Sequence, residues 1–250
     1  MLKKVLCLLM CFSLLSIGVV NAQTKENVSK VVFKAEEITD ISKIEERADK
    51  GITDDKNFTA ASCIIKDNNG SPIDIKSAKT TSQKIKETKS DNGDTITEYS
   101  ANIIASIPGP EEISAYDSNG YNALLYVNVS YEVGTLGTYN LYKINSLKGK
   151  LVKLDSSIVL SRMDIQEMCY GTKYTSVSSS GFAGVDSYNM TAIANSPTNN
   201  TYYYNNSLSP YYWNLADGTA GTYIKGITTG YFSRAGSSWS AQVDWKRTAS

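Results

Sequence analysis

Hydrophobic and polar residues alternate along most of the chain after residue 57, which is the pattern of strands with one buried face. Asn-Gly steps that end at Gly70 and Gly93 are strong turn signals between the alternating stretches. A further turn is expected at residues 147–150. The pattern predicts strands over residues 58–66, 72–78, 95–107, 123–133, 138–146, 151–154 and 158–170. Short strands with frequent turns are typical of antiparallel sheets.

The most regular of the predicted strands lies at the C-terminus. There Trp239, Ala241, Val243 and Trp245 alternate with polar residues, so we expect both tryptophans to be buried. The predicted fold is mainly β, an immunoglobulin-like antiparallel β-sandwich over residues 111–250, with a closed barrel as the alternative. The strands of residues 58–110, which end at a Pro-Gly-Pro sequence, either complete that sandwich or form a smaller layer before it.

The first 22 residues have the three parts of a secretory signal peptide. Lys3 and Lys4 precede an uncharged apolar run over residues 5–20, and Ala22 ends a fitting cleavage site. The run of about 16 residues is shorter than the roughly 20 that a spanning helix needs. The sequence therefore predicts a secreted, extracellular mature chain that begins at Gln23 and has no transmembrane anchor.

Residues 23–57 form a polar leader in which we expect a short helix over residues 40–50. Its apolar residues recur at helical spacing, at Ile38, Ile41 and Ile44. Ser42 and Glu45 fit a capping box, and Gly51 fits the end of the helix.

Composition removes several classes of function. The chain has no histidine, which excludes Ser-His-Asp and Cys-His catalysis and any histidine-ligated metal. We expect no catalytic residue, no metal and no cofactor. Loss of the leader removes two lysines and leaves 23 basic residues (25 minus 2) against 25 acidic ones. A weakly negative chain has no general attraction for nucleic acid.

Two cysteines remain after the leader is removed, Cys63 and Cys169. An even count in a secreted chain suggests a disulfide, and two buried, reduced thiols are the alternative. Spacing alone does not test the Cα separation of about 4.4–6.8 Å that a bridge requires, so both alternatives stay open.

Several short motifs lie between residues 120 and 247. They are an alternating strand near residues 126–133, Asp-Ser-Ser-Ile-Val-Leu-Ser at 155–161, Cys-Tyr-Gly at 169–171 and Gly-Ser-Ser-Trp-Ser-Ala-Gln-Val at 236–243. In these motifs the chain resembles uncharacterised secreted proteins of Gram-positive, clostridium-type bacteria. The resemblance covers about half of the chain. It implies secretion and a β-rich domain, and it implies no catalytic residue.

Residues 168–233 are rich in tyrosine and poor in charge. They contain ten of the seventeen tyrosines and only four charged residues. Aromatic rings among serine and asparagine suit the binding of glycans or proteins, and packing between strands is the alternative. The candidate ligand-binding residues are Tyr202, Tyr203, Tyr204, Tyr211, Tyr212 and Trp213. The first three are consecutive, so at least one of them must point outward from a strand.

These observations favour a secreted, non-enzymatic surface or recognition module, with a cell-wall glycan or a surface protein as its partner. A carboxylate-dependent glycan hydrolase is one alternative, with Glu111 and Glu112 as the paired acids. A membrane-active β protein is another, because residues 172–195 have the composition of a membrane hairpin. Gly181 and Gly184 interrupt the alternation of that segment.

Overall fold

The computed structural model describes residues 29–58, 61–108, 121–215 and 221–248, so the predicted signal peptide lies outside it, as do Glu111 and Glu112. Over the described residues the protein is mainly β, with thirteen strands in one antiparallel sheet. No helix in these ranges has the length and apolar character needed to cross a membrane. The elements are β1 (Ser29–Lys34), α2 (Ile41–Asp49), β2 (Ser62–Lys66), β3 (Pro72–Ser77), β4 (Lys79–Ser90), β5 (Thr95–Pro108), β6 (Tyr121–Leu136), β7 (Tyr139–Lys153), β8 (Val159–Tyr174), the short 3-10 helix η1 (Ser179–Gly181), β9 (Phe182–Asn195), β10 (Tyr202–Tyr204), β11 (Tyr212–Asn214), β12 (Tyr223–Arg234) and β13 (Ser237–Thr248).

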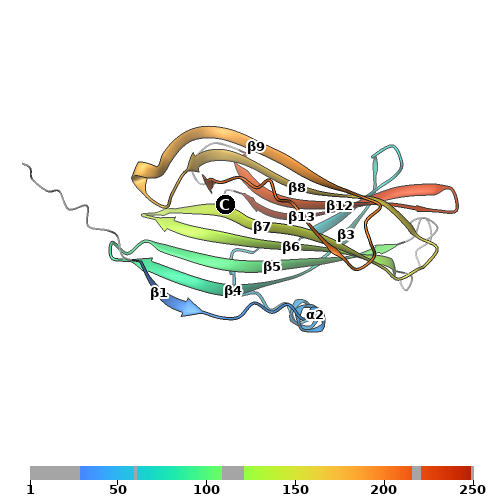
Figure 1. Ribbon diagram of the computed structural model, residues 1–250, viewed down its shortest axis with the longest axis horizontal. Coiled ribbons are helices and arrows are strands. Elements are labelled where there is room, and N and C mark those ends of the chain that lie inside the picture. Colours follow the sequence, from blue (N-terminus) through green and yellow to red (C-terminus); the bar gives the residue numbers. More distant parts are fainter. Residues whose placement is uncertain (1–28, 59–60, 109–120, 216–220, 249–250) are drawn as a thin grey trace, which may run out of the picture.

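The strands are long and give the molecule an elongated shape (Figure 1). Their order in the sheet is β1-β4-β5-β6-β7-β11-β8-β12-β13-β2-β3. β10 pairs with β7, and β9 pairs with β8. All three residues of β11 pair with β8, and Trp213 and Asn214 also pair with β7, so β11 joins the two halves of the sheet.

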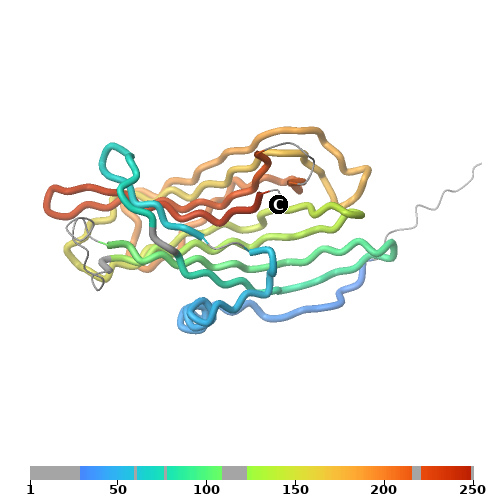
Figure 2. The backbone as a smooth tube through the Cα atoms, turned by 180° about the vertical axis from the view of Figure 1, so that it is seen from behind, coloured from blue at the N-terminus to red at the C-terminus, as the bar shows by residue number. Residues whose placement is uncertain are grey.

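The sheet folds over on itself (Figure 2), and residues of both halves share one apolar core. Tyr131 of β6 contacts Trp245 of β13, with ring centroids 4.7 Å apart. Trp245 is 1% exposed and Trp239 is 3% exposed, so the predicted burial of both tryptophans is confirmed. β2 pairs with β13 and β5 pairs with β6, so strands from residues 58–110 and from residues 111–250 share one sheet.

The turn expected at residues 147–150 is wrong, because β7 runs straight through it. Gly149 weakens the strand pattern in the sequence, yet the packing of the two halves requires a glycine there. A Cβ at this position would lie 2.7 Å from Cγ2 of Thr228 on β12. The glycine thus marks a close approach of β7 and β12 within a strand.

The predicted helix is present as α2, but Ser42 and Glu45 do not form its cap. Oδ1 of Asp40 accepts hydrogen bonds from the Ser42 and Lys43 amides at 2.9 and 3.3 Å. Ile44 packs on Ile104 and Tyr126, so the helix covers part of the outer side of β5 and β6. Glu45 is free of the cap and accepts a hydrogen bond from the Tyr126 hydroxyl at 2.7 Å.

Cys63 and Cys169 are both buried, free thiols. Cys63 pairs with Val243 on β13, while Cys169 lies on β8, with β12 between β13 and β8. Neighbouring strands are about 4.8 Å apart, so three such steps exceed the reach of a disulfide. Of the two alternatives left open by the sequence, the structure has the reduced thiols.

Candidate functional site

The six aromatic candidates divide between the two sides of the sheet. Tyr202 pairs with Lys150 and Tyr204 with Lys148, so these two rings share the outer side of β7 with two lysines. Tyr203 pairs with Gly149 and packs against the core. Its hydroxyl accepts a hydrogen bond from the Thr198 amide at 2.8 Å. Alternation along β10 therefore separates one ring from the other two.

The remaining three candidates have structural contacts near β11. Trp213 is buried, and its Nε1 donates to Oγ of Ser209 at 3.0 Å. Tyr211 packs on the same core, with Nζ of Lys173 4.8 Å from its ring centroid. Tyr212 is buried on the other side, where its hydroxyl donates to Glu132. The structure therefore brings together only Tyr202 and Tyr204 as a surface.

Two lysines of β7 lie among three tyrosine rings, and we call this group the lysine–tyrosine surface (Tyr126, Lys148, Lys150, Tyr202 and Tyr204). Nζ of Lys148 lies 5.1 Å from the Tyr202 ring centroid and 6.0 Å from that of Tyr204. Nζ of Lys150 lies 4.4 Å from the Tyr126 centroid and 4.9 Å from that of Tyr202. Each distance fits a cation–π contact. The Tyr202 ring thus lies between the two ammonium groups.

Burial differs across this surface. Lys150 is 1% exposed, whereas Lys148 is half-buried and Tyr204 is 53% exposed. Burial lowers the pKa of Lys150, and the nearby Glu45 carboxylate opposes that shift. Burial also raises the pKa of Tyr202. Lys150 therefore supports the surface from below, while Lys148 and Tyr204 face solvent.

Sequence reasoning missed both lysines because residues 147–150 were interpreted as a turn. Residues two apart on a strand share a face, so a continuous strand places Lys148 and Lys150 on one side. Tyr126 lies beside them on the same face, because it pairs with Lys150 across β6 and β7. The alternation on either side of Gly149 is the signal that could have found the pair.

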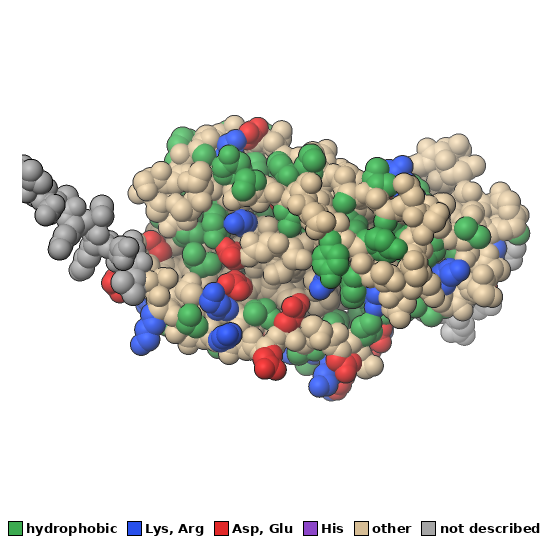
Figure 3. All heavy atoms as spheres, viewed as in Figure 1, with side chains coloured by type: hydrophobic (Ala, Val, Ile, Leu, Met, Phe, Trp, Pro, Cys, Tyr) green, Lys and Arg blue, Asp and Glu red, His purple; other side chains and the backbone are tan. Residues whose placement is uncertain are grey.

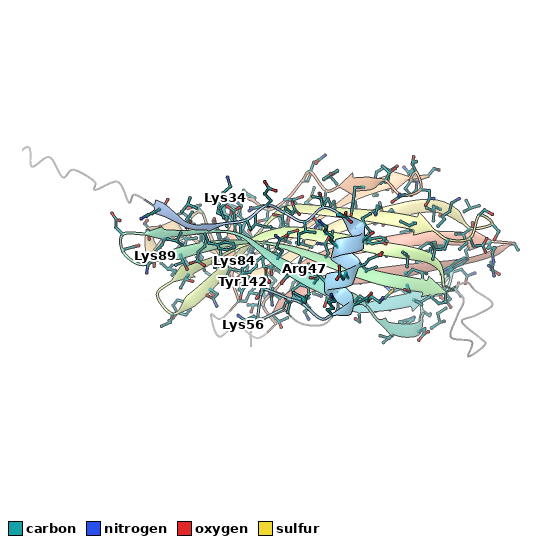
Figure 4. The ribbon with its side chains drawn as sticks, turned by 90° about the horizontal axis from the view of Figure 1, so that it is seen from below. Lys34, Arg47, Lys56, Lys84, Lys89 and Tyr142 are labelled. Atoms are coloured by element: carbon teal, nitrogen blue, oxygen red, sulfur yellow. The ribbon has the colours of Figure 1, made fainter. Side chains whose placement is uncertain are left out.

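A second group of lysines lies on the edge formed by β1 and β4, where Figure 4 labels Lys34, Lys84 and Lys89. Lys84 forms an ion pair with Glu87, and Lys86 pairs with Glu98 at 3.1 Å. Acidic partners therefore offset much of the positive charge of this edge. Figure 3 shows charged side chains of both signs over this part of the molecule and few over the upper part.

One described pocket, of about 140 Å³, lies near the tip of the β4–β5 hairpin. It is small beside the roughly 300–1,000 Å³ of sites for drug-sized ligands. Its lining combines polar and apolar groups and consists of Ser29, Thr88, Ser90, Asn92, Asp94, Ile96, Val177 and Ser178. Within the described ranges no cluster of three or more acidic, cysteine or histidine side chains is arranged to hold a metal ion.

Comparison of the chain with protein-family models, with curated proteins and with solved structures finds no match.

Proposed function

We propose that the protein is a secreted, non-enzymatic recognition module that binds acidic glycans through the lysine–tyrosine surface. The observation that carries this proposal is the position of Lys148 between the rings of Tyr202 and Tyr204 on an open face. Tyrosine rings stack on the apolar faces of sugars, and a lysine beside them binds an acidic substituent.

Secretion and the finer description of the fold belong to the same proposal. The leader over residues 1–22 supports export and cleavage before Gln23. The contact of Tyr131 with Trp245 across the folded sheet supports an immunoglobulin-like β-sandwich as the scaffold. N-terminal sequencing of the protein from culture medium tests export, and an uncleaved product confined to cells would contradict it.

Binding is tested by retention of the mature protein on an array of neutral and acidic glycans and on isolated cell walls. We expect retention on acidic glycans that weakens with added salt, because a lysine contact is screened. Tyr204→Ala and Lys148→Gln should each reduce it about tenfold. Release of soluble sugar during the same incubation would overturn the non-enzymatic assignment.

The chain offers a matched control for this experiment. Nζ of Lys225 lies 4.7 Å from the ring centroid of Tyr223 on β12, away from the lysine–tyrosine surface. Lys225→Gln removes the same charge from a similar stack. It should leave retention unchanged, and an equal loss in both lysine variants would show that only net charge matters.

A further inference from the structure

We propose, beyond the recognition function, that β8 and β9 form a membrane-inserting hairpin that is packed against the rest of the protein in the soluble state. β9 forms the outermost strand at one side of the molecule (Figure 1). It pairs only with β8, and most of its side chains are exposed. We assign a lipid bilayer as the environment that the released hairpin enters.

The two faces of the hairpin differ in polarity. On the inner face the register pairs are Met163 with Ala194, Ile165 with Ala192, Glu167 with Met190, Cys169 with Tyr188 and, nearest the tip, Gly171 with Asp186. On the outer face they are Arg162 with Asn195, Asp164 with Ile193, Gln166 with Thr191, Met168 with Asn189, Tyr170 with Ser187 and Thr172 with Val185, so polar residues predominate there although Ile193 and Val185 are exposed. A mainly apolar face opposite a mainly polar one, with a period of two, is the pattern of strands that cross membranes.

The length of the hairpin also fits a bilayer. Eleven register pairs run from Arg162 with Asn195 to Thr172 with Val185. A spanning strand needs about 9–11 residues. Gly181 and Gly184, which interrupt the alternation in the sequence, both lie at the tip, outside the eleven pairs. The two glycines therefore do not interrupt the alternation within the eleven paired positions.

The tip is suited to entering a bilayer first. Residues 174–185 carry no charged side chain. Phe182 is 61% exposed, and its ring contacts that of Tyr174 with centroids 5.9 Å apart. Below the tip, Lys173 and Asp186 neutralise each other as an ion pair across the hairpin. An uncharged, polar tip with an aromatic pair has a low barrier to transfer through hydrocarbon compared with a charged one.

In the soluble state a crossing segment, residues 205–211, covers the inner face, and we call this segment the strap. Nδ2 of Asn205 donates to the carbonyl oxygens of Ile165 on β8 and Met190 on β9, both at 3.1 Å. The Tyr188 hydroxyl donates to the Ser207 carbonyl at 2.8 Å. These hydrogen bonds hold the strap over the inner side of the hairpin and satisfy polar groups of both strands.

Two carboxylates lie on the inner face within the span: Asp186, which is paired with Lys173 near the tip, and Glu167, which is fully buried. Its Oε2 accepts a hydrogen bond from the Ser209 amide of the strap at 2.7 Å. The other groups that face it are Cys169 and Tyr188, and its partner on β12 is Gly226. Burial raises the pKa of Glu167 to about 7. Acid therefore removes a charge that a bilayer would oppose.

The tip is docked on the body by Val177. A Cβ built on Gly134 of β6 would lie 3.3 Å from Cβ of Val177, so the loop between β8 and η1 lies directly against β6. Insertion must break this contact and must separate β8 from both of its other partners, β11 and β12. Copies of the chain then pair their hairpins edge to edge, because every backbone group in lipid needs a partner.

The Gly134 and Val177 contact supplies a reversible lock. Cβ atoms in disulfides are about 3.5–4.5 Å apart, so Gly134→Cys with Val177→Cys should form a bridge with little movement. We expect the mature protein to release dye from phosphatidylcholine vesicles, with or without phosphatidylglycerol, and to do so faster at acid pH. The oxidised double variant should release none, and reduction should restore release. Release that is equal in the oxidised and reduced forms would overturn the proposal, as would no release by the wild type from either vesicle.

A second pair of variants needs no bridge. Met190 is 42% exposed on the apolar face, and Asn189 is exposed on the polar face. Met190→Asp should reduce dye release about tenfold or more, and Asn189→Asp should leave it nearly unchanged. Equal effects would overturn the assignment of faces. Glycan retention by the locked protein is expected to be normal, so failure of this proposal is distinguishable from failure of the recognition function.

Discussion

Arg247 of β13 and Asp55, which precedes β2, form a buried ion pair that ties the end of the chain to its N-terminal region. The Tyr131 hydroxyl donates to the same carboxylate. The rings of Phe58, Tyr131 and Trp245 surround the guanidinium, with centroids 5.5, 5.7 and 6.0 Å from its carbon. Nε and Nη1 of Arg247 have no hydrogen-bond partner among the described residues, so Asp55 and Tyr131 supply its polar contacts.

Asp55→Asn should therefore reduce the free energy of unfolding by about 3–5 kcal/mol, because it leaves a guanidinium buried without its counter-ion. Urea denaturation followed by circular dichroism measures the change. Glu46→Gln breaks the exposed pair of Glu46 with Lys50 and serves as the control. Its denaturation curve should match that of the wild type, and a similar shift in both variants would contradict this account.

Trp245→Ala should reduce the free energy of unfolding by about 3–5 kcal/mol, since the indole is 1% exposed and contacts Tyr131. Thermal melting and urea denaturation both report the change. Tyr139→Ala on β7 is the matched control, because that ring is 47% exposed. If Trp245→Ala melts like Tyr139→Ala, β13 does not hold the core together as described.

Gly149→Ala should destabilise the protein by about 1–3 kcal/mol, because the added methyl group overlaps Thr228 of β12. Thr228→Ala removes the overlapping atoms, along with a buried hydroxyl that has no hydrogen-bond partner in the described structure. The double variant should regain much of the stability lost in Gly149→Ala. A double-mutant cycle with no coupling between the two positions would be incompatible with the close approach of β7 and β12.

Glu167 should make stability fall as pH rises. Its folded-state pKa of about 7 lies above the ordinary value of 4.5, so the folded protein binds the proton more tightly than the unfolded chain. The stabilisation is complete below about pH 4.5 and is lost between about pH 4.5 and 7, by up to about 3 kcal/mol. Urea denaturation across this range measures the slope. Glu167→Gln should flatten it, and an unchanged slope would assign the pH dependence to other groups.

Alternation predicted the strands that have one apolar and one polar side. β13 and β6 follow the pattern closely, and the inward positions of β6 are the ones expected from the sequence. β4 was not predicted, because most of its side chains are polar and only half-buried at the outer part of the sheet. β9 was missed for a related reason, since an outermost strand with exposed faces has little hydrophobic signal.

The candidate site could be predicted only in part. A run of three tyrosines indicates that at least one ring points outward. Which ring does so depends on which face of β10 lies on the core side of the sheet. That choice is made by pairing, which places Gly149 opposite Tyr203 and the lysines opposite Tyr202 and Tyr204. A contact between segments some fifty residues apart leaves no local pattern, so Lys148 and Lys150 could not be linked to β10 from the sequence.

The pairing of β2 with β13 joins Cys63 to Val243, which are 180 positions apart (243 minus 63). Closing the long loop between such distant segments costs chain entropy before the contacts of the ladder can form. We therefore expect this ladder to form late in folding. During synthesis β2 must wait for the last strand of the chain to be made. The sheet is thus completed only when the whole polypeptide is available, and until then β2 and β3 lack the strand that connects them to β12.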